Sequence, residues 1–469
     1  MTIFTGRSKH LGHLRTILDG RDCRIVRVVG IRGGGKSTFV RRAFADYGGL
    51  FHTCAPLPDA ALRATFSSRV RDALTADGTE AWSDLSAESG WAEILDGVEA
   101  LARTSDRPFV LALDDAHRLG QAHARFAGPL ATLLSRSASS GAPPIHVVLI
   151  GPAGELPTTQ ELSPHEPETI ELEPLPLRAA VPLLPGSAPE DVLLAYGVFG
   201  GTPAVLARLD RDVTVGTNVR RLVLNPEGVL ADASATWLER DVQAPARYNA
   251  IMSALALGET DWSSVHAGVP DLTRSGQVAP YLTRLSTLGL VTTRRSLDAD
   301  PKGRSTRYAL SDPFLTFWYR FVPPLRFSGD KEPESVSYAR TVRPSLENHL
   351  RSVFPIMCRQ HMRHDAIETL GTNARESGSL WSPDHEIPVA GLLASGAAYY
   401  GVCSWAPERR TDSPLTRIAR AMKNTRYGFG RERRLRIVFT GRPAPLWLRR
   451  EIARDQDAVL IDAAALVGD

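Results

Sequence analysis

The sequence predicts an α/β protein with a parallel sheet covered by helices, followed by smaller helical and α/β parts. Three short apolar runs are typical of strands: Ile25–Val29, Val110–Leu113 and Ile145–Ile150. Helical segments separate them, and this alternation builds a parallel sheet with both faces covered. A glycine-rich stretch follows the first strand directly. At 469 residues the chain is too long for one ordinary core, so we expect several domains.

The residues Gly30–Ser37 fit the pattern G-x-x-x-x-G-K-[ST] between the first strand and a predicted helix, Ser37–Tyr47. Glycines let backbone N–H groups face phosphate oxygens, and the helix N-terminus adds positive potential. This loop predicts a site for ATP or GTP with Mg²⁺. We expect Lys36 to contact the β- and γ-phosphates and Ser37 to ligate Mg²⁺. The predicted nucleotide-binding residues here are Gly30, Arg32, Gly33, Gly34, Gly35, Lys36, Ser37 and Thr38.

Two acids follow the second strand. Phe109–Leu113 ends in Asp114 and Asp115, which is the second element that a phosphate-binding loop needs. By itself this pattern equally fits a strand meeting solvent, but the loop favours a catalytic role. We expect Asp114 to hold the Mg²⁺ shell together with Ser37, and Asp115 to orient or deprotonate the attacking water. Lys36, Asp114 and Asp115 are therefore the predicted catalytic residues.

The composition, with 43% hydrophobic and 23% charged residues, is that of a soluble globular protein. Met1–Arg7 contains no apolar signal-peptide core, and the four cysteines form no C-x-x-C pair. We therefore expect a cytoplasmic protein without a disulfide framework. Ile387–Ala406 lacks charges, yet a turn signal in its middle predicts two buried strands joined by a hairpin rather than a membrane helix.

The net charge of +3 conceals an asymmetry. Residues 405–450 contain thirteen Lys or Arg and three acids, a net charge of +10, so the remainder carries −7. Such a segment can neutralise the phosphates of DNA or RNA. It fits equally a solvated face, or one that docks on an acidic partner such as an operon-encoded protein. The candidate nucleic-acid residues are Arg431, Arg433, Arg434 and Arg436.

The middle of the chain is mostly helical. A proline-rich stretch leads to a predicted helical lid over residues 189–240. Three helical patterns and two strands over residues 248–310 then predict a winged helix. Its third helix would enter a major groove in a DNA-binding version, whereas such a module can also cover the nucleotide as a lid. The wing residues expected to contact a DNA backbone are Arg294, Arg295, Lys302, Arg304 and Arg307.

Several motifs together resemble the archaeal-type (DEXX-box) ATPases of the STAND branch of AAA+ P-loop proteins. They are Phe4-Thr5-Gly6-Arg7, Asp114-Asp115, the stretch Tyr196–Pro203 that ends in Gly-Gly-Thr-Pro, and Tyr308–Phe321 with its Asp-Pro-Phe and Phe-Trp-Tyr sequences. The resemblance implies ATP rather than GTP, with Pro203 near the adenine. From the residues alone, Pro203 is equally a proline in a first helical turn.

Two details qualify this resemblance. The family usually places a small polar residue after the strand Ile145–Ile150, whereas Gly151-Pro152 follows here, so we expect slow hydrolysis. The aromatic residues of the last motif recur at i, i+3, i+4 and i+7, which predicts a buried helix face rather than a ligand site. These residues are Phe314, Phe317, Trp318 and Phe321.

The C-terminal part resembles a PD-(D/E)XK nuclease domain, in which acids on two strands hold Mg²⁺ and a lysine supports the attacking water. The corresponding stretches are Glu386-Ile387-Pro388 and Val402-Cys403-Ser404-Trp405. Pro388, Val402 and Ser404 thus stand where two acids and the lysine belong. A metal-dependent nuclease fails without its ligands, so we expect a nuclease fold without nuclease activity.

These patterns predict an ATP-binding and ATP-hydrolysing switch that couples its nucleotide state to a C-terminal domain recognising nucleic acid or a protein partner, with an oligomer possible. The alternative is a DNA-binding regulator that holds nucleotide without hydrolysing it. The predicted domains are residues 1–205 (ATPase core), 206–245 (helical lid), 246–312 (winged helix), 313–345 (aromatic helix and linker) and 346–469 (degenerate nuclease-like basic domain).

Overall fold

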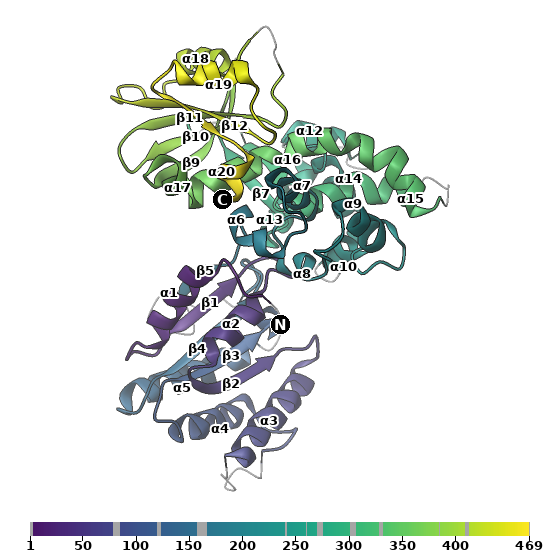
Figure 1. Ribbon diagram of the computed structural model, residues 1–469. Helices are drawn as coiled ribbons and strands as arrows, with labels where there is room; N and C mark the ends of the chain where they lie inside the picture. Colours follow the sequence, from purple (N-terminus) through teal and green to yellow (C-terminus); the bar gives the residue numbers. More distant parts are fainter. Residues whose placement is uncertain are drawn as a thin grey trace. The chain divides into compact units, whose positions relative to one another are not determined.

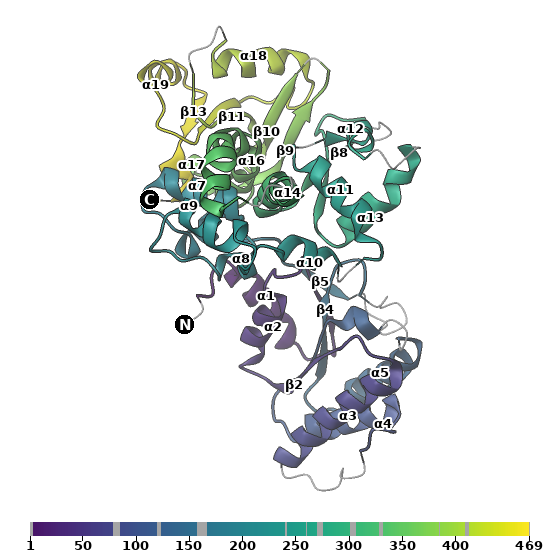
Figure 2. The ribbon, with the colours of Figure 1, turned by 90° about the vertical axis from the view of Figure 1, so that its right-hand side faces the viewer.

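The computed structural model divides the chain into two compact units (Figures 1 and 2). The smaller unit comprises Arg7–Glu173 and Thr287–Gly289, and the larger unit comprises Met1–Gly6, Pro174–Ser286 and Leu290–Asp469. The residues that the structure describes are 3–77, 85–119, 123–156, 167–239, 242–258, 260–269, 275–300, 306–327, 332–383, 385–408 and 412–468.

The smaller unit contains a five-stranded sheet in the order β2-β3-β4-β1-β5, and every neighbouring pair is parallel. The predicted α/β fold class is therefore confirmed, and the three predicted strands are β1, β3 and β4. The edge strands β2 and β5 are partly exposed and lack a long apolar run. The strand bounds are β1 Ile25–Val29, β2 Gly48–Thr53, β3 Phe109–Asp114, β4 Ile145–Gly151 and β5 Glu168–Glu171.

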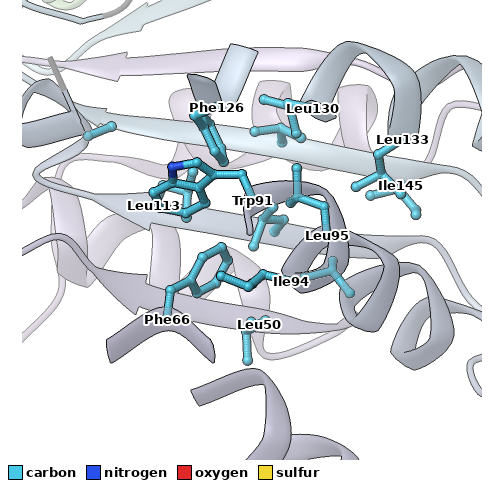
Figure 3. Packing of buried hydrophobic residues seen from close by; sticks show 14 of the residues in the cluster. Leu50, Phe66, Trp91, Ile94, Leu95, Leu113, Phe126, Leu130, Leu133 and Ile145 are labelled. Carbon is cyan, nitrogen blue, oxygen red and sulfur yellow. The ribbon is translucent and has the colours of Figure 1, made fainter. Parts of the chain in front are cut away.

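Helices cover both faces of this sheet (Figure 2). Alternate side chains of β3 point to opposite faces, as the strand geometry requires. Val110 and Ala112 pack with Phe39, whereas Leu111 and Leu113 pack with the cluster in Figure 3. The first face carries α1 Ser8–Leu18 and α2 Lys36–Phe44, and the second carries α3 Asp59–Ala76, α4 Trp91–Arg103 and α5 His123–Ser139.

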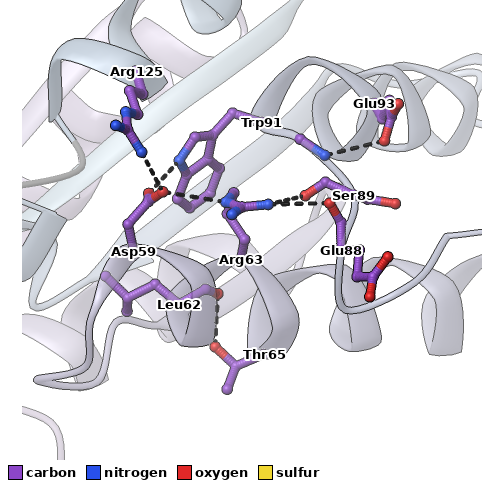
Figure 4. Close-up of polar contacts among 10 residues, drawn as sticks. Asp59, Leu62, Arg63, Thr65, Glu88, Ser89, Trp91, Glu93 and Arg125 are labelled. Carbon is purple, nitrogen blue, oxygen red and sulfur yellow. Dashed lines mark hydrogen bonds and ion pairs between the residues drawn. The ribbon is translucent and has the colours of Figure 1, made fainter.

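A polar network ties the helices of the second face together (Figure 4). The carboxylate of Asp59 accepts hydrogen bonds from Trp91 Nε1 at 2.9 Å and Arg63 Nε at 3.3 Å, and it pairs with Arg125. Arg63 also donates to the carbonyl of Ser89 at 2.7 Å. Although burial favours the protonated form, these bonds and charges lower the pKa of Asp59. The ring of Trp91 is buried, so its bond to Asp59 lies at the inner end of this network.

The larger unit begins with short helices. Residues 174–205 belong to this unit, so the structure divides the chain at Glu173 rather than at the predicted boundary of 205. The reason is local: Tyr196 Oη donates to the carbonyl of Leu175 at 2.7 Å, and Leu175 N donates to Gly201 O. The helices are α6 Leu177–Ala180, α7 Pro189–Phe199, α8 Pro203–Leu206, α9 Val215–Asn218 and α10 Ala233–Glu239, with 3-10 turn η4 Val181–Leu183 and π-helical segment η5 Val219–Leu224.

Three helices and a small antiparallel sheet follow, in the strand order β6-β8-β7. Their sequence order matches the predicted winged-helix pattern, and that assignment stays a prediction. The bounds are α11 Pro245–Leu255, β6 Thr260–Asp261, α12 Trp262–Ala267, α13 Val278–Thr287, β7 Val291–Arg295 and β8 Thr306–Leu310.

The next helix, α14 Pro313–Phe327, buries the predicted aromatic face. Phe314 and Phe317 are fully buried, and Trp318 and Phe321 are at most 5% exposed, so the prediction of core packing is confirmed. After it come α15 Glu334–Ser337, η7 Tyr338–Val342, α16 Arg343–His364 and α17 Ala366–Leu370.

The C-terminal sheet is mixed and has the order β13-β12-β11-β10-β9. Strands β9, β10 and β11 are antiparallel, and β11, β12 and β13 are parallel. The predicted hairpin is thus confirmed as β10 and β11. Figure 1 shows α16 and α17 on one face and α18 and α19 on the other. The bounds are β9 Ala374–Trp381, β10 Glu386–Leu393, β11 Ala398–Ser404, α18 Pro414–Asn424, β12 Arg434–Thr440, α19 Leu446–Ala453, β13 Ala458–Ile461 and α20 Ala463–Val467.

Among the described helices, none combines the length and the apolar composition that crossing a membrane requires.

Candidate nucleotide-binding site

The predicted phosphate loop joins β1 to α2, and two of its glycines are sterically required. Gly35 caps the helix with φ +84°, a left-handed conformation that L side chains rarely adopt. A Cβ on Gly30 would lie 2.4 Å from the carbonyl oxygen of Leu172, so the loop runs close against the segment after β5. The sequence therefore fixes a tight loop at the amino end of a helix, where anions bind.

The ammonium group of Lys36 lies within this loop. Its Nζ donates to the carbonyl oxygens of Gly30 at 2.9 Å and Ile31 at 2.8 Å. The positive charge therefore lies where the phosphates of a bound nucleotide are predicted. Arg32 is half-buried in the same loop, and Thr38 is exposed in the first turn of α2.

The side chains of Ser37 and Asp114, the two residues predicted to hold Mg²⁺, lie next to each other. Their side chains are hydrogen-bonded although they lie on α2 and at the carboxyl end of β3. Burial raises the pKa of Asp114, and the negative charge of Asp115 adds to this, while the Ser37 bond and the charge of Lys36 oppose it. A cation beside this carboxylate would stabilise its ionised form. The donor set and its charge thus fit Mg²⁺, which prefers oxygen ligands.

Asp115 has a strained backbone at the position predicted for the catalytic acid. Its φ of +53° is uncommon for a residue other than glycine. Its N–H donates to Asp114 Oδ1 at 3.1 Å, and its carboxylate lies 3.6 Å from Arg118 Nε. Arg118 belongs to the short helix η2 Ala116–Leu119 and was not predicted from the sequence. The sequence offered one signal for this pair, since Arg118 follows Asp115 by three residues and such a spacing allows an ion pair within one helical turn.

At the carboxyl end of β4, where the resembling family carries a small polar side chain, this chain has Gly151. Gly151 is buried, and a Cβ on it would lie 2.7 Å from Leu156 Cδ2 and 3.2 Å from His117 Nδ1. The imidazole of His117 is therefore the polar group beside this strand end. Sequence reasoning did not identify it, since His117 lies after a different strand.

Pro203 occupies the first turn of α8, after the helix N-cap Thr202. The interpretation of Pro203 as a proline in a first helical turn is therefore confirmed. Pro203 belongs to the larger unit, and its contact with adenine stays a prediction.

A buried carboxylate joins the two motifs of the larger unit. Asp312 Oδ2 accepts from Gly201 N at 3.0 Å and from Thr202 Oγ1 at 2.8 Å, and Oδ1 accepts from Phe314 N at 2.8 Å. A Cβ on Gly200 would lie 1.6 Å from Asp312 Oδ1. Burial raises the pKa of Asp312 to about 6, although the hydrogen bonds favour the ionised form.

Two arginine side chains contact the stretch that resembles a nuclease site. Glu386, at the start of β10, pairs with Arg307 Nη1 at 2.7 Å, and this guanidinium lies 4.7 Å above the ring of Trp381. Arg359 Nη1 donates to the carbonyl of Pro388 at 3.0 Å. Within the described ranges, no group of three or more His, Cys, Asp or Glu side chains is placed to hold a metal ion.

The same contacts correct the prediction for the wing. Arg307 is held by Glu386, and Arg294 donates to Ser379 of β9, so these two side chains engage the C-terminal sheet instead of facing a DNA backbone. Burial lowers the pKa of Arg294 to about 8. Arg295 donates to the carbonyl of Asp300 at 3.0 Å. Lys302 and Arg304 lie outside the described residues.

Two of the four candidate nucleic-acid residues are paired with acids. Arg433 Nε lies 3.0 Å from Asp457, and Arg436 Nη2 lies 2.6 Å from Asp455. Arg431 and Arg434 are exposed. Two acids just beyond residues 405–450, Asp455 and Asp457, thus offset part of the positive charge of this segment. Arg409 and Arg410 of the basic segment fall in a stretch that the structure leaves undescribed.

Comparison with known proteins agrees with the site in the smaller unit. Residues 3–150 match a family profile described as AAA ATPase domain, AAA_16. This part of the chain is similar to AAA ATPase domains. No curated protein matches the chain by sequence.

One of three solved structures that are similar to this chain supports the fold, with a TM-score above 0.5. The Walker-type ATPase PABY2304 of Pyrococcus abyssi matches with a TM-score of 0.52 and 17% identity over 67% of this chain and 95% of that chain. The Aeropyrum pernix ORC2 protein in ADPNP-ADP complexes matches with a TM-score of 0.39 and 14% identity over 69% of this chain and 95% of its own. A Pyrococcus horikoshii STAND protein with a tetratricopeptide repeat sensor, PH0952, matches with a TM-score of 0.31 and 14% identity. The match covers 78% of this chain and 52% of that chain.

Proposed function

We propose that this protein is an ATP-binding molecular switch that hydrolyses ATP slowly and couples its nucleotide state to a C-terminal domain that binds nucleic acid. The observation that carries the proposal is the hydrogen bond between Ser37 and Asp114. It joins the end of the phosphate loop to the acid at the carboxyl end of β3, and these two elements together hold Mg²⁺ in P-loop ATPases.

Each residue of this site has a distinct role. The loop and Lys36 bind the phosphates, and Ser37 with Asp114 holds Mg²⁺, which supplies charge neutralisation for phosphoryl transfer. Asp115 accepts a proton from, or orients, the attacking water. Arg118 and the backbone bond to Asp114 position Asp115. The proposal that the nucleotide is ATP rather than GTP rests on the similarity of residues 3–150 to AAA ATPase domains.

The alternative is a regulator that holds ATP without turning it over. One observation favours it: Gly151, at the end of β4, has no side chain that could sense the γ-phosphate. His117 is the candidate substitute, because it lies beside that glycine. Measured turnover of ATP by the purified protein, with and without DNA or RNA, separates the two functions.

Lys36→Ala is expected to abolish thermal stabilisation by ATP and Mg²⁺. A ligand held only by the native state stabilises it by RT ln(1 + [L]/Kd), about 2.7 kcal/mol at a hundredfold excess over Kd. Melting curves with and without nucleotide measure this effect. Lys9→Ala, an exposed lysine of α1, is the matched control and should retain the full shift. A wild-type melting curve that ATP leaves unchanged, with no heat of binding in calorimetry, would contradict the proposal.

The C-terminal domain is proposed to be a nuclease-like fold that binds nucleic acid without cutting it. Pro388 and Val402 cannot ligate a metal through their side chains, and Glu386 is paired with Arg307. Phosphodiester hydrolysis of this type requires such ligands. Neither Mg²⁺ nor Mn²⁺ should therefore elicit cleavage of DNA or RNA. Metal-dependent cleavage that disappears in Glu386→Ala would refute this.

Binding by the basic segment is expected to depend strongly on salt. Because Arg431 and Arg434 are exposed, replacing both with alanine should flatten the log–log salt slope by about 1 to 2 units, at roughly 0.7 to 0.9 per lost phosphate contact. Replacing Arg433 and Arg436, which pair with acids, should change the slope less. Anisotropy titrations across a salt series test this contrast. Equal slopes for both double variants and the wild type would place the phosphate contacts elsewhere.

A further inference from the structure

The loop between α18 and β12 presents an aromatic side chain to solvent. Phe429 is 83% exposed, more than any other large hydrophobic side chain in the described part of the chain. Burying such a ring is favourable, so an exposed phenylalanine on an ordered loop calls for an explanation.

The base of this loop is firmly attached. Thr425 Oγ1 donates to Asp298 at 2.7 Å, Tyr400 Oη donates to the carbonyl of Tyr427 at 2.5 Å, and Tyr427 Oη donates to Glu376. A Cβ on Gly428 would lie 2.6 Å from Ala398 Cβ, so the backbone lies directly against the start of β11.

The tip of the loop is formed by two successive turns. Phe429 N donates to the carbonyl of Arg426 at 3.1 Å, and Arg431 N donates to that of Gly428 at 3.3 Å. The glycines on either side of the ring, Gly428 and Gly430, have φ of +67° and +80°. The backbone geometry therefore holds the phenylalanine outward on a fixed base.

Cationic side chains surround this residue in the sequence. Arg426, Arg431 and Arg434 are all exposed, and in the described structure their side chains form neither an ion pair nor a hydrogen bond. Arg433 between them is neutralised by Asp457. One ring with several unpaired guanidinium groups complements a ligand that has a flat base and a chain of phosphates.

We propose that Phe429 stacks on a base of single-stranded nucleic acid while Arg426, Arg431 and Arg434 contact its phosphates. This inference rests on the proposed nucleic-acid binding of the C-terminal domain and specifies the form of its ligand. A duplex keeps its bases stacked and paired, so it offers no free face to the ring. A lipid surface would require several apolar side chains together. The other exposed large hydrophobic residues of the C-terminal domain, Ile367 and Leu446, lie on different helices.

The test uses full-length protein and a labelled oligo-dT strand about 20 nucleotides long at roughly 50 mM salt, followed by anisotropy. Phe429→Ala and Phe429→Leu should each weaken binding by about tenfold or more, because stacking on one base is worth that much. Phe429→Tyr should bind like the wild type. The salt slope should stay unchanged in all three variants, since no charge is altered. Leu446→Ala, which removes another exposed apolar side chain, should have no effect.

The outcomes separate this inference from the proposed function. If the wild type binds the strand and Phe429→Leu binds equally well, stacking is overturned while nucleic-acid binding stands. Equal affinity for a duplex of the same length, insensitive to Phe429→Ala, overturns it in the same way. Binding to anionic vesicles that Phe429→Ala loses and Phe429→Leu keeps assigns the loop to a membrane surface. If no nucleic acid binds at this salt concentration, both the inference and the proposed role of the domain fail.

Discussion

Asp115→Asn is expected to lower ATP turnover by a factor of about 10² to 10⁴ while ATP affinity stays near that of the wild type. An amide keeps the size of the side chain but cannot accept a proton. Because Asp114, rather than Asp115, is hydrogen-bonded to Ser37, the Mg²⁺ residues remain intact in this variant. Single-turnover hydrolysis and calorimetric titration with ATP measure the two quantities separately.

Asp106→Asn, an exposed acid ahead of β3, is the control for this prediction and should hydrolyse ATP at the wild-type rate. Two results speak against the role of Asp115. One is loss of ATP binding as complete as in Lys36→Ala, which would make Asp115 a binding residue. The other is unchanged turnover, which would assign the attacking water to another group.

Asp312→Ala is expected to destabilise the larger unit by at least about 3 kcal/mol. The substitution leaves the N–H groups of Gly201 and Phe314 and the hydroxyl of Thr202 without their acceptor, and each unsatisfied buried group costs about 1 to 3 kcal/mol. Urea unfolding followed by tryptophan fluorescence measures the loss. Asp212→Ala, an exposed acid of the same unit, is the control and should change stability little.

The contribution of Asp312 to stability should change with pH in a defined direction. Burial raises its pKa in the folded state to about 6, from 3.8 for the free side chain. Between about pH 4 and pH 6 the folded state therefore binds more protons than the unfolded state, so this residue's contribution to stability falls as the pH rises. Asp312→Asn should remove that part of the pH dependence. A variant whose stability follows the wild-type pH profile throughout this window would show that Asp312 does not titrate there.

Much of the smaller unit could be predicted because its signals are local. The strands β1, β3 and β4 are short apolar runs at the centre of the sheet, and the phosphate loop and its lysine are contiguous in the sequence. The acids follow a buried strand, so parallel pairing brings them to the same sheet edge as the loop. In the structure the side chains of Ser37 and Asp114 lie together at this edge.

What the sequence did not reveal depends on pairings between distant residues. The edge strands β2 and β5 are partly exposed to solvent and contain glycine or charged residues. They therefore lack the continuous apolar run that marks a buried strand. Arg307 lies far from Glu386 in the chain, and no periodicity predicts that a wing arginine neutralises an acid of the C-terminal sheet. Likewise the acids that pair with Arg433 and Arg436 come from the turn before β13. Charge counts along the sequence cannot include such neutralisation.

The packing of α20 has a consequence for the order in which the protein folds during synthesis. Arg178 donates to the carbonyl of Ala465 at 3.1 Å, so the segment of the larger unit that begins at Pro174 contacts α20 near the other end of the sequence. Domains generally fold as units while the ribosome is still extending the chain. The smaller unit has all its strands once residue 171 has left the ribosome, whereas Ala465, the acceptor for Arg178, is added nearly three hundred residues later, an interval of about 15 to 60 s at typical elongation rates. Early termination of translation would therefore leave the larger unit without α20 and without this hydrogen bond.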